Sequence, residues 1–425
     1  MQSSASLKRT LGLPGALLMG LGSMVGTGVF ISIGLASGVA GAAVLPAIAL
    51  AAGVALCNGM SSAQLAAAHP VSGGSYEYGY KYLLPELGFS AGWMFLLAKS
   101  ASAATAALGF SGYLLHQLDL ADRVPLLIPA LILIAGMTLL VQSGLRRSNR
   151  MNTLVVSLTL FSLLLFVFTL LPQYVVPENL HFDLADLCTP GFLKGCALMF
   201  VAYTGYGRIA TMGEEIREPR KNIPRAIFAV MMITSLLYLL VALSAIGAVS
   251  ADELGKMTRS GAAPLEMILT TLGKPKTASL VTLGALTAMF GVLLNLILGL
   301  SRVLFAMGRR GDMPKIFAEV KNHSPKAAVL GVGVLIALIA LPGKVQIVWA
   351  FSAFTVLVYY VITNLAALRL PAEDRLYPRI FSWIGLLSCL FLAFQVGMYY
   401  WLAGASILMI GLLWQKARRK YSKEA

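Results

Sequence analysis

Residues Gly20–Phe30 read Gly-Leu-Gly-Ser-Met-Val-Gly-Thr-Gly-Val-Phe and lie in the middle of a long apolar stretch. Four glycines fall within nine residues here, and a continuous helix is penalised by about 1 kcal/mol per glycine relative to alanine. Two interpretations are open for this stretch taken alone. The glycines permit close packing of membrane helices, or they mark the point where a spanning helix is interrupted.

A second glycine-containing stretch, Tyr203–Arg208, reads Tyr-Thr-Gly-Tyr-Gly-Arg and follows the apolar run Leu198–Ala202. It lies five predicted spans after the first. Glycine-interrupted helices at matching positions of two halves indicate a transporter built from inverted repeats, with its substrate at the bilayer midplane. Interrupted helices expose N–H groups that suit a carboxylate and carbonyl groups that suit an ammonium. The pair therefore predicts a site for a small zwitterion.

The composition indicates a membrane protein. Of 425 residues, 58% are hydrophobic and 12% are charged, with a mean hydropathy of +0.80, whereas a soluble domain has about a quarter charged residues. Apolar runs bounded by charge or by Pro and Gly predict an all-α polytopic fold with about twelve transmembrane helices. The predicted spans are 12–36, 40–67, 87–116, 124–143, 151–172, 191–213, 224–249, 277–306, 327–342, 345–370, 378–396 and 398–415.

The basic residues separate between the two sides of this predicted membrane. Most of the 33 Lys and Arg residues fall on the side that also holds both termini, and such residues collect in cytoplasmic loops. Both termini are therefore predicted to be cytoplasmic, in a bacterial-type cytoplasmic (inner) membrane. The net charge of +15 is spread over every inner loop, so it does not indicate binding of nucleic acid.

Four separate stretches of the chain form a recognisable set in sequence order. They are Gly22–Phe30, Ala66–Tyr76, Gly213–Arg225, and Ser301–Arg302 with Gly311–Pro314. These stretches resemble the first helix, the first cytoplasmic loop, the loop after the sixth helix and the end of the eighth helix of the amino acid–polyamine–organocation (APC) permeases. The resemblance implies the leucine-transporter fold, which has a 5+5 inverted repeat with broken helices 1 and 6, followed here by two C-terminal helices.

The same resemblance divides the chain into segments. Residues 12–172 are expected to form the first five-helix repeat, and residues 191–370 the second, inverted repeat. Residues 378–415 are expected to form helices 11 and 12. The flanking segments 1–11 and 416–425 are the predicted cytoplasmic termini.

The family's substrate site transfers to the two glycine-containing stretches. The resemblance implies that the substrate carboxylate binds the Thr27 hydroxyl and the N–H groups of Thr27 and Gly28. It also implies that the substrate ammonium binds carbonyl groups on both helices, those of Met24, Val201, Ala202 and Thr204. The full predicted set of substrate-binding residues is Ser23, Met24, Val25, Gly26, Thr27, Gly28, Val201, Ala202, Tyr203, Thr204 and Gly205.

Two basic residues, Lys99 and Arg208, lie inside predicted spans, where each costs about 2.5–3.5 kcal/mol. Lys99 is a candidate for proton coupling or charge compensation. The alternative is a lysine packed beside helix-end carbonyl groups with no role in transport. Arg208 is interpreted as the partner of Glu214 or Glu215 in a structural ion pair, and the alternatives are contact with a substrate side chain or a place in the inner vestibule.

The coupling ion is left open by the sequence. Several proton-linked relatives carry a lysine on helix five at the position of Thr159, so that route is in doubt here. Sodium coupling requires paired hydroxyls on span eight, where Asn295 offers an amide. The coupling or gating candidates are Lys99, Thr159, Tyr206, Arg208 and Asn295, and proton coupling and exchange without an obligatory ion both remain.

The predicted function is secondary active transport, by symport or exchange, of an amino acid or related amine through alternating access. A channel is the second hypothesis, and a membrane enzyme is the third, although no span holds an Asp, Glu or His pair. Neither a metal site nor a cofactor is expected, because the four cysteines form no C-x-x-C motif and an ATP-binding signature is absent. Small residues on span three predict room for an apolar substrate side chain. They are Ala101, Ser102, Ala103, Ala104, Ala106 and Ala107.

Overall fold

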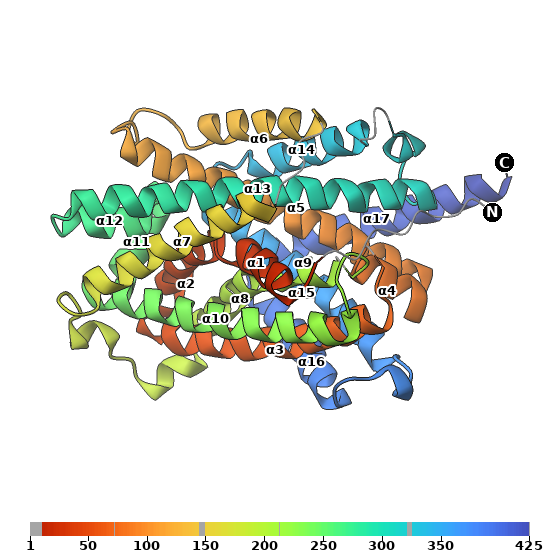
Figure 1. Cartoon of the computed structure of the whole chain (residues 1–425), viewed down its shortest axis with the longest axis horizontal. Helices are drawn as coiled ribbons and strands as arrows, with labels where there is room; N and C mark the ends of the chain where they lie inside the picture. Colours follow the sequence, from red (N-terminus) through yellow and green to blue (C-terminus); the bar gives the residue numbers. More distant parts are fainter. Residues whose placement is uncertain (1–10, 72, 144–148, 212, 321–324, 425) are drawn as a thin grey trace.

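The computed structural model describes residues 11–71, 73–143, 149–211, 213–320 and 325–424. Most of the long helices run side by side along the longest axis of the molecule (Figure 1). Within the described residues, extended pairing is limited to one bridge between Leu11 and Ile216. The predicted N-terminal segment 1–11 lies outside the described residues except for Leu11. The basic residues at 146 and 147 also lie outside them.

Each predicted span coincides with a helix or with consecutive helical segments. The α-helices are α1 (Leu13–Met24), α2 (Ile33–Ala40), α3 (Val44–Ala68), α4 (Ser75–Tyr82), α5 (Pro85–Gln117), α6 (Leu127–Gln142), α7 (Asn149–Leu170), α8 (Pro190–Tyr203), α9 (Gly207–Thr211), α10 (Pro219–Val249), α11 (Ala251–Gly261), α12 (Pro264–Thr271), α13 (Pro275–Arg310), α14 (Lys326–Ala340), α15 (Val345–Leu368), α16 (Arg379–Gln395) and α17 (Met398–Glu424). Short π or 3₁₀ segments are η1 (Gly28–Ser32), η2 (Gly41–Ala43), η3 (Pro177–Leu180), η4 (Leu184–Cys188), η5 (Thr204–Tyr206), η6 (Lys315–Ala318) and η7 (Ala372–Asp374).

Three helices, α4, α11 and α12, lie outside the predicted spans. A search for apolar runs does not find them, because they carry polar residues along one side. In α11, the N–H of Glu253 donates to the Ser250 hydroxyl, and Asp252 and Glu253 occupy the first turn. Both features stabilise a helix N-terminus, so capping rather than hydrophobicity explains this helix.

Seven helical runs among the described residues are long and apolar enough to cross a membrane. An eighth is added if the bent pair Pro177–Cys188 and Pro190–Thr211 counts as one span. The run Leu13–Ala68 has 56 residues and covers two of the predicted spans, whereas one crossing needs about 20 residues. Helices α6, α14 and α16 are apolar but shorter. The count of twelve crossings therefore stays a prediction.

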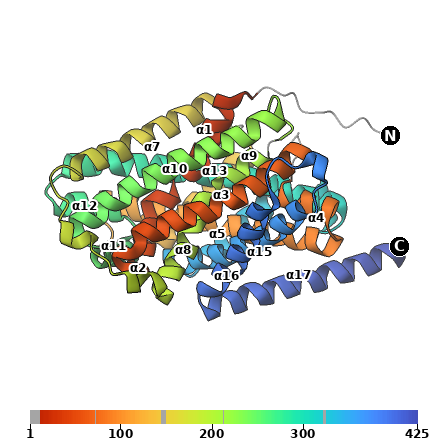
Figure 2. The same cartoon turned by 90° about the horizontal axis from the view of Figure 1, so that it is seen from below.

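Helix α5 lies at the centre of the bundle, where it packs against α13 and α15. The outer helices expose large apolar side chains, including Ile132 on α6, Phe168 on α7, Leu387 on α16 and Leu413 on α17. Figure 2 shows α17 running along one edge of the bundle. An apolar outer surface around a packed interior is the arrangement expected for helices surrounded by lipid.

Candidate functional site

The first helix loses α-helical geometry at the predicted glycine-rich stretch. Helix α1 ends at Met24, and its C-cap, Val25, has φ −82° and ψ 88°, outside the helical region. The chain continues through Gly26 and Thr27 into the π-helical segment η1 and then α2. The Val25 N–H still donates to the Leu21 carbonyl and the Phe30 N–H to the Gly26 carbonyl, but the Val29 N–H also donates to Gly26 at the i to i−3 spacing. The regular i to i−4 pairing of an α-helix is therefore only partly kept here.

The second glycine-containing stretch also changes geometry. Helix α8 ends at Tyr203 and is followed by the 3₁₀ turn η5 and the short helix α9. The Thr204 hydroxyl donates to the carbonyl oxygen of Val201 at 2.7 Å. A 3₁₀ turn inside a helix changes which carbonyl groups are paired, so Thr204 presents its own carbonyl and hydroxyl oxygens to neighbouring groups.

The two stretches lie against each other. A Cβ on Gly205 would come within 2.4 Å of the Ser23 carbonyl oxygen, and a Cβ on Gly28 within 2.9 Å of the Ala202 Cβ. Glycine is therefore required at both positions for this approach of one backbone to the other. From α10, the Tyr238 hydroxyl lies 2.5 Å from the Met24 carbonyl oxygen and 3.2 Å from that of Ala202. One side chain thus bridges both stretches.

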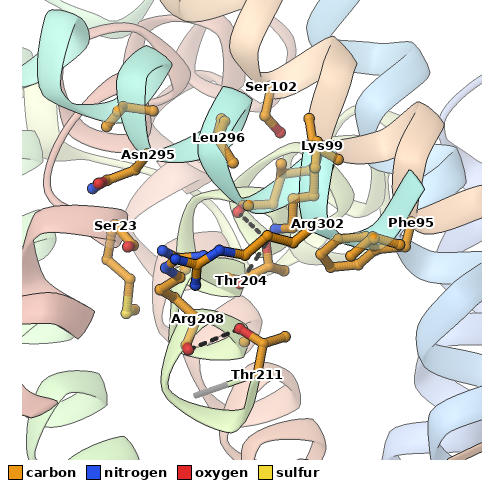
Figure 3. Close-up of a pocket in the computed structure, with 18 of the residues that line it drawn as sticks. Ser23, Phe95, Lys99, Ser102, Thr204, Arg208, Thr211, Asn295, Leu296 and Arg302 are labelled. Carbon is orange, nitrogen blue, oxygen red and sulfur yellow. Dashed lines mark hydrogen bonds between the residues drawn. The ribbon is translucent and has the colours of Figure 1, made fainter. Parts of the chain in front are cut away.

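A cavity of about 550 Å³ lies beside this junction. Its lining begins at the two stretches and extends along α13 to Arg309, next to the end of that helix. Figure 3 shows Lys99, Arg208 and Arg302 reaching into the region between Ser23 and Phe95. This volume lies within the range of roughly 300–1,000 Å³ found for small-molecule sites.

The Thr27 hydroxyl is an unsatisfied polar group on the cavity wall. Thr27 is 4% exposed, and its Oγ1 has no hydrogen-bond partner among the described residues. Buried hydroxyls are ordinarily paired. The donor and acceptor capacity of Thr27 is therefore available to a bound molecule.

Lys99 meets the second stretch from α5. Its Nζ donates to the Thr204 hydroxyl at 2.9 Å and to the Thr204 carbonyl oxygen at 3.3 Å. Lys99 is 8% exposed and lines the cavity. The structure therefore combines two features of the sequence interpretation, because this lysine is packed beside a helix-end carbonyl and also faces the candidate site.

The other charges lie toward the end of α13. Arg208, Glu214, Arg302 and Arg309 all line the cavity. Arg302 pairs with Glu215 at 3.8 Å. One of the two glutamates considered as partners of Arg208 therefore pairs with an arginine of another helix.

Most of the predicted substrate-binding residues line the cavity. Those that do are Ser23, Met24, Thr27, Gly28, Val201, Ala202, Thr204 and Gly205, and among the coupling candidates Lys99, Arg208 and Asn295 do so as well. Val25, Gly26 and Tyr203 are not part of the lining, and neither are Thr159 and Tyr206. The Thr159 hydroxyl donates to the Val155 carbonyl oxygen within α7.

The two tyrosines of the second stretch pack against other helices. Tyr203 lies against the ring of Tyr238, with 5.1 Å between centroids, and Tyr206 lies 5.8 Å from Tyr360. Both are fully buried. Both tyrosines, predicted from the sequence as a substrate contact and a gating candidate, therefore pack between helices in this structure.

The carbonyl groups expected to receive a substrate ammonium already accept hydrogen bonds. Tyr238 donates to Met24 and Ala202, the Thr204 hydroxyl donates to Val201, and Lys99 donates to Thr204. A carbonyl oxygen has two lone pairs, so each retains some capacity. The second stretch nevertheless carries an ammonium group that belongs to the protein.

Sequence reasoning identified Asn295 but missed the rest of the cavity wall that α13 forms. Asn295, Gly299, Arg302, Ala306 and Arg309 line it at intervals of three and four residues, which place them on one face of a helix. Helical periodicity around Asn295 is the signal that predicts this face. Tyr238 carried no comparable signal, because its contacts with Met24 and Ala202 depend on how α10 packs.

The small residues of α5 do not open the cavity as expected. Ser102 is the one member of that group in the lining, and its hydroxyl lies 2.9 Å from that of Ser352. The alanines from 101 to 107 are fully buried. They permit close packing of α5 against its neighbours. Their small size therefore does not indicate the size of the substrate side chain.

Comparisons with known proteins give consistent results. The family model described as amino acid permease matches residues 15–424. An uncharacterized transporter of Mycobacterium tuberculosis is 36% identical, over 99% of this chain and 93% of its own length. The branched-chain amino acid permease of Bacillus subtilis is 27% identical, over 98% of this chain and 95% of its own length. The vacuolar cationic amino acid transporter 4 of Arabidopsis thaliana is 25% identical, over 79% of this chain and 58% of its own length.

Proposed function

This chain belongs to the amino acid permease family, and we propose that it is a secondary active transporter, a symporter or an exchanger, of an amino acid or related amine. Its apolar helices and its family make it an integral membrane protein. The family and these relatives are named as permeases or transporters rather than enzymes.

One observation carries the proposal. A single cavity is lined by residues of both stretches. They are Ser23, Met24, Thr27 and Gly28 on the first, and Val201, Ala202, Thr204 and Gly205 on the second. Two interrupted helices that meet beside a cavity are the arrangement from which inverted-repeat transporters bind substrate. We therefore assign residues 12–172 and 191–370 to the two repeats and residues 378–415 to two further helices.

The same geometry supports a mode of substrate binding. The Thr27 hydroxyl has no partner among the described residues, and the N-terminal end of the following helical segment provides N–H groups. Partial positive charge at a helix start favours a carboxylate. In this proposal the substrate carboxylate lies at Thr27 and Gly28.

Orientation follows from the charge distribution and the contacts at one end of the bundle. The Leu11 N–H donates to the Glu215 carbonyl, Glu215 pairs with Arg302, and Arg419 pairs with Glu86. The Arg418 guanidinium also donates to the Met313 carbonyl oxygen just after α13, so both described ends of the chain lie beside the C-terminal part of α13. We propose that this basic end is cytoplasmic, in an inner membrane of bacterial type. A cavity extending to Arg309 is then an inward-facing one.

Lys99 is the coupling residue that the geometry favours. It presents an amine to the cavity from α5, whereas Thr159 of α7 is not part of the lining. Other titratable or charged groups facing the cavity are Arg208, Glu214, Arg302 and Arg309. We propose that protonation of Lys99 is linked to substrate occupancy, which makes protons the candidate coupling ion.

Reconstitution in proteoliposomes tests the proposed function. Vesicles loaded with unlabelled amino acid should accumulate the labelled amino acid transiently above its equilibrium level, because an alternating-access carrier exchanges substrates. A channel gives no such counterflow, so monotonic equilibration at all internal concentrations would exclude the carrier. Varying pH and sodium separately then distinguishes proton symport, sodium symport and exchange.

A further inference from the structure

The charged groups around the cavity are unequal in number. Among the described residues, four basic side chains line the cavity, against one acidic side chain, that of Glu214. The basic ones are Lys99, Arg208, Arg302 and Arg309. An excess of one sign in a cleft with apolar walls raises the local concentration of ligands of the opposite sign.

These basic groups differ in how strongly they can act on a ligand. The Arg302 side chain is 62% exposed and pairs with Glu215, and Arg309 is exposed at the end of α13. Water and salt screen such groups. Lys99 is 8% exposed, so its charge is the least screened of the four. Lys99 is therefore the basic group that acts most strongly on a ligand in the cavity.

Neutral oxygen atoms are the only partners of Lys99 among the described residues. Its two hydrogen bonds go to the hydroxyl and the carbonyl of Thr204. An ammonium group has three donors, so one is left for a ligand. Buried charges in proteins are ordinarily paired with an opposite charge. A ligand carboxylate in the cavity supplies that opposite charge.

The position of Lys99 also affects an ordinary zwitterion. The Thr204 carbonyl, which a substrate ammonium was expected to contact, holds the Lys99 ammonium instead. Two ammonium groups at one carbonyl repel each other. A second carboxylate on the substrate offsets this repulsion by pairing with Lys99, whereas a basic side chain increases it.

We infer that the cavity selects amino acids with an acidic side chain. The inference rests on the proposed function and names its substrate class. The α-carboxylate lies at Thr27 and Gly28, and the side-chain carboxylate lies at Lys99. Substrates with an uncharged side chain are weaker ligands, and those with a basic side chain are the weakest.

Binding measurements on the full-length protein in detergent test the inference directly. L-Glutamate and L-glutamine have nearly the same shape and differ by one negative charge, and L-aspartate and L-asparagine form a second matched pair. Titration at constant ionic strength should give a Kd for each acid at least tenfold lower than for its amide. Equal affinities within a pair, or tighter binding of L-lysine or L-leucine, would overturn the inference.

A Lys99 variant tests whether this residue causes the preference for acidic substrates. Lys99→Met removes the charge at similar side-chain length, and it should reduce the ratio of the glutamine Kd to the glutamate Kd at least tenfold. Lys344→Met, at the start of α15 and outside the cavity lining, is the control and should keep the parent ratio. If Lys99→Met kept the ratio of the parent protein, Lys99 would not be the residue that selects acidic substrates. If that variant does not fold, the matched pairs on the parent protein still decide the substrate class.

The outcomes separate this inference from the proposed function. Counterflow of leucine or lysine without a preference for acidic amino acids would overturn the acidic subsite and leave the transporter intact. Binding of glutamate without counterflow would instead contradict the transporter. Counterflow of glutamate, inhibited by aspartate more strongly than by asparagine, supports both.

Discussion

The two interrupted helix stretches have similar sequences but different chemistry. The first, around Thr27, presents a hydroxyl without a partner among the described residues. The second, around Thr204, has its hydroxyl and carbonyl oxygens bonded to Lys99. The first is therefore available to a ligand, while the second already holds a cation of the protein. We therefore expect Thr27 to bind the substrate and Thr204 to bind a side chain of the protein itself.

Bringing the two stretches together depends most on Gly205. Gly205→Ala places a Cβ within 2.4 Å of the Ser23 carbonyl oxygen, and backbone cannot move aside as a flexible side chain can. We expect a loss of about 1–3 kcal/mol of stability and loss of counterflow, measured by thermal unfolding in detergent and by transport. Gly136→Ala is the control, since nothing lies within 4 Å of the new atom. An unchanged unfolding temperature for Gly205→Ala would show that the two stretches are not in contact.

The second stretch should be stabilised by Thr204. Thr204→Val keeps the shape and removes the hydroxyl that accepts from Lys99 at 2.9 Å. Loss of a hydrogen bond to a charged group costs about 1.5–3 kcal/mol, so the unfolding temperature should fall. In a Lys99→Met background the same change should cost much less, because the ammonium is gone. Additive effects in this double-mutant cycle would contradict the interaction.

Loss of the Tyr238 hydroxyl, which bridges the two stretches, should lower stability by a smaller amount. Tyr238→Phe removes the hydroxyl that donates to the carbonyl oxygens of Met24 and Ala202. Hydrogen bonds between membrane helices contribute roughly 0.6–1.7 kcal/mol, so a modest fall in unfolding temperature is expected. Tyr399→Phe, on an exposed residue of α17, is the control. If the unfolding temperature of Tyr238→Phe fell no more than that of this control, the Tyr238 hydroxyl would not stabilise the contact between the two stretches.

The first stretch should show the smallest effect on stability and a clear effect on binding. Thr27→Val replaces an unpartnered hydroxyl by a methyl group, so the unfolding temperature should stay the same or rise slightly. Substrate affinity should fall by about tenfold, equivalent to about 1.4 kcal/mol. Titration of ligand against thermal unfolding measures both quantities. A Thr27→Val protein that is destabilised but binds normally would reverse the proposed roles of the two threonines.

Much of the architecture could be predicted from local sequence. Apolar runs place α3, α5 and α15 within a few residues of their observed ends, because hydrophobicity and length determine which segments avoid water. The glycines at 26, 28, 205 and 207 predicted where α-helical geometry changes. The polar helices α4 and α11 were missed, since neither contains a long apolar run. Helix α11 begins at the Ser250 cap, and α4 packs against α5 and α15.

The candidate site was predictable to a lesser degree. Lys99 was identified from the sequence as a buried charge, but its bonds to Thr204 join residues 105 positions apart. The cavity face of α13 was predictable from the three- and four-residue spacing around Asn295. The placement of Tyr203 and Tyr206 was not, because a tyrosine at a helix interruption has the same local sequence whether it packs inward or lines a cavity.

By itself, the sequence determined that the chain is helical and apolar and that two glycine-containing stretches change its helical geometry, since these properties depend on neighbouring residues. Only the tertiary structure shows that the two stretches lie in contact and that Tyr238 bridges them. It also shows that the Thr204 hydroxyl accepts a hydrogen bond from Lys99. Such contacts depend on how distant helices pack. A hydrogen bond forms only when its donor and acceptor lie about 3 Å apart. Whether two distant residues meet that distance is set by the packing of their helices.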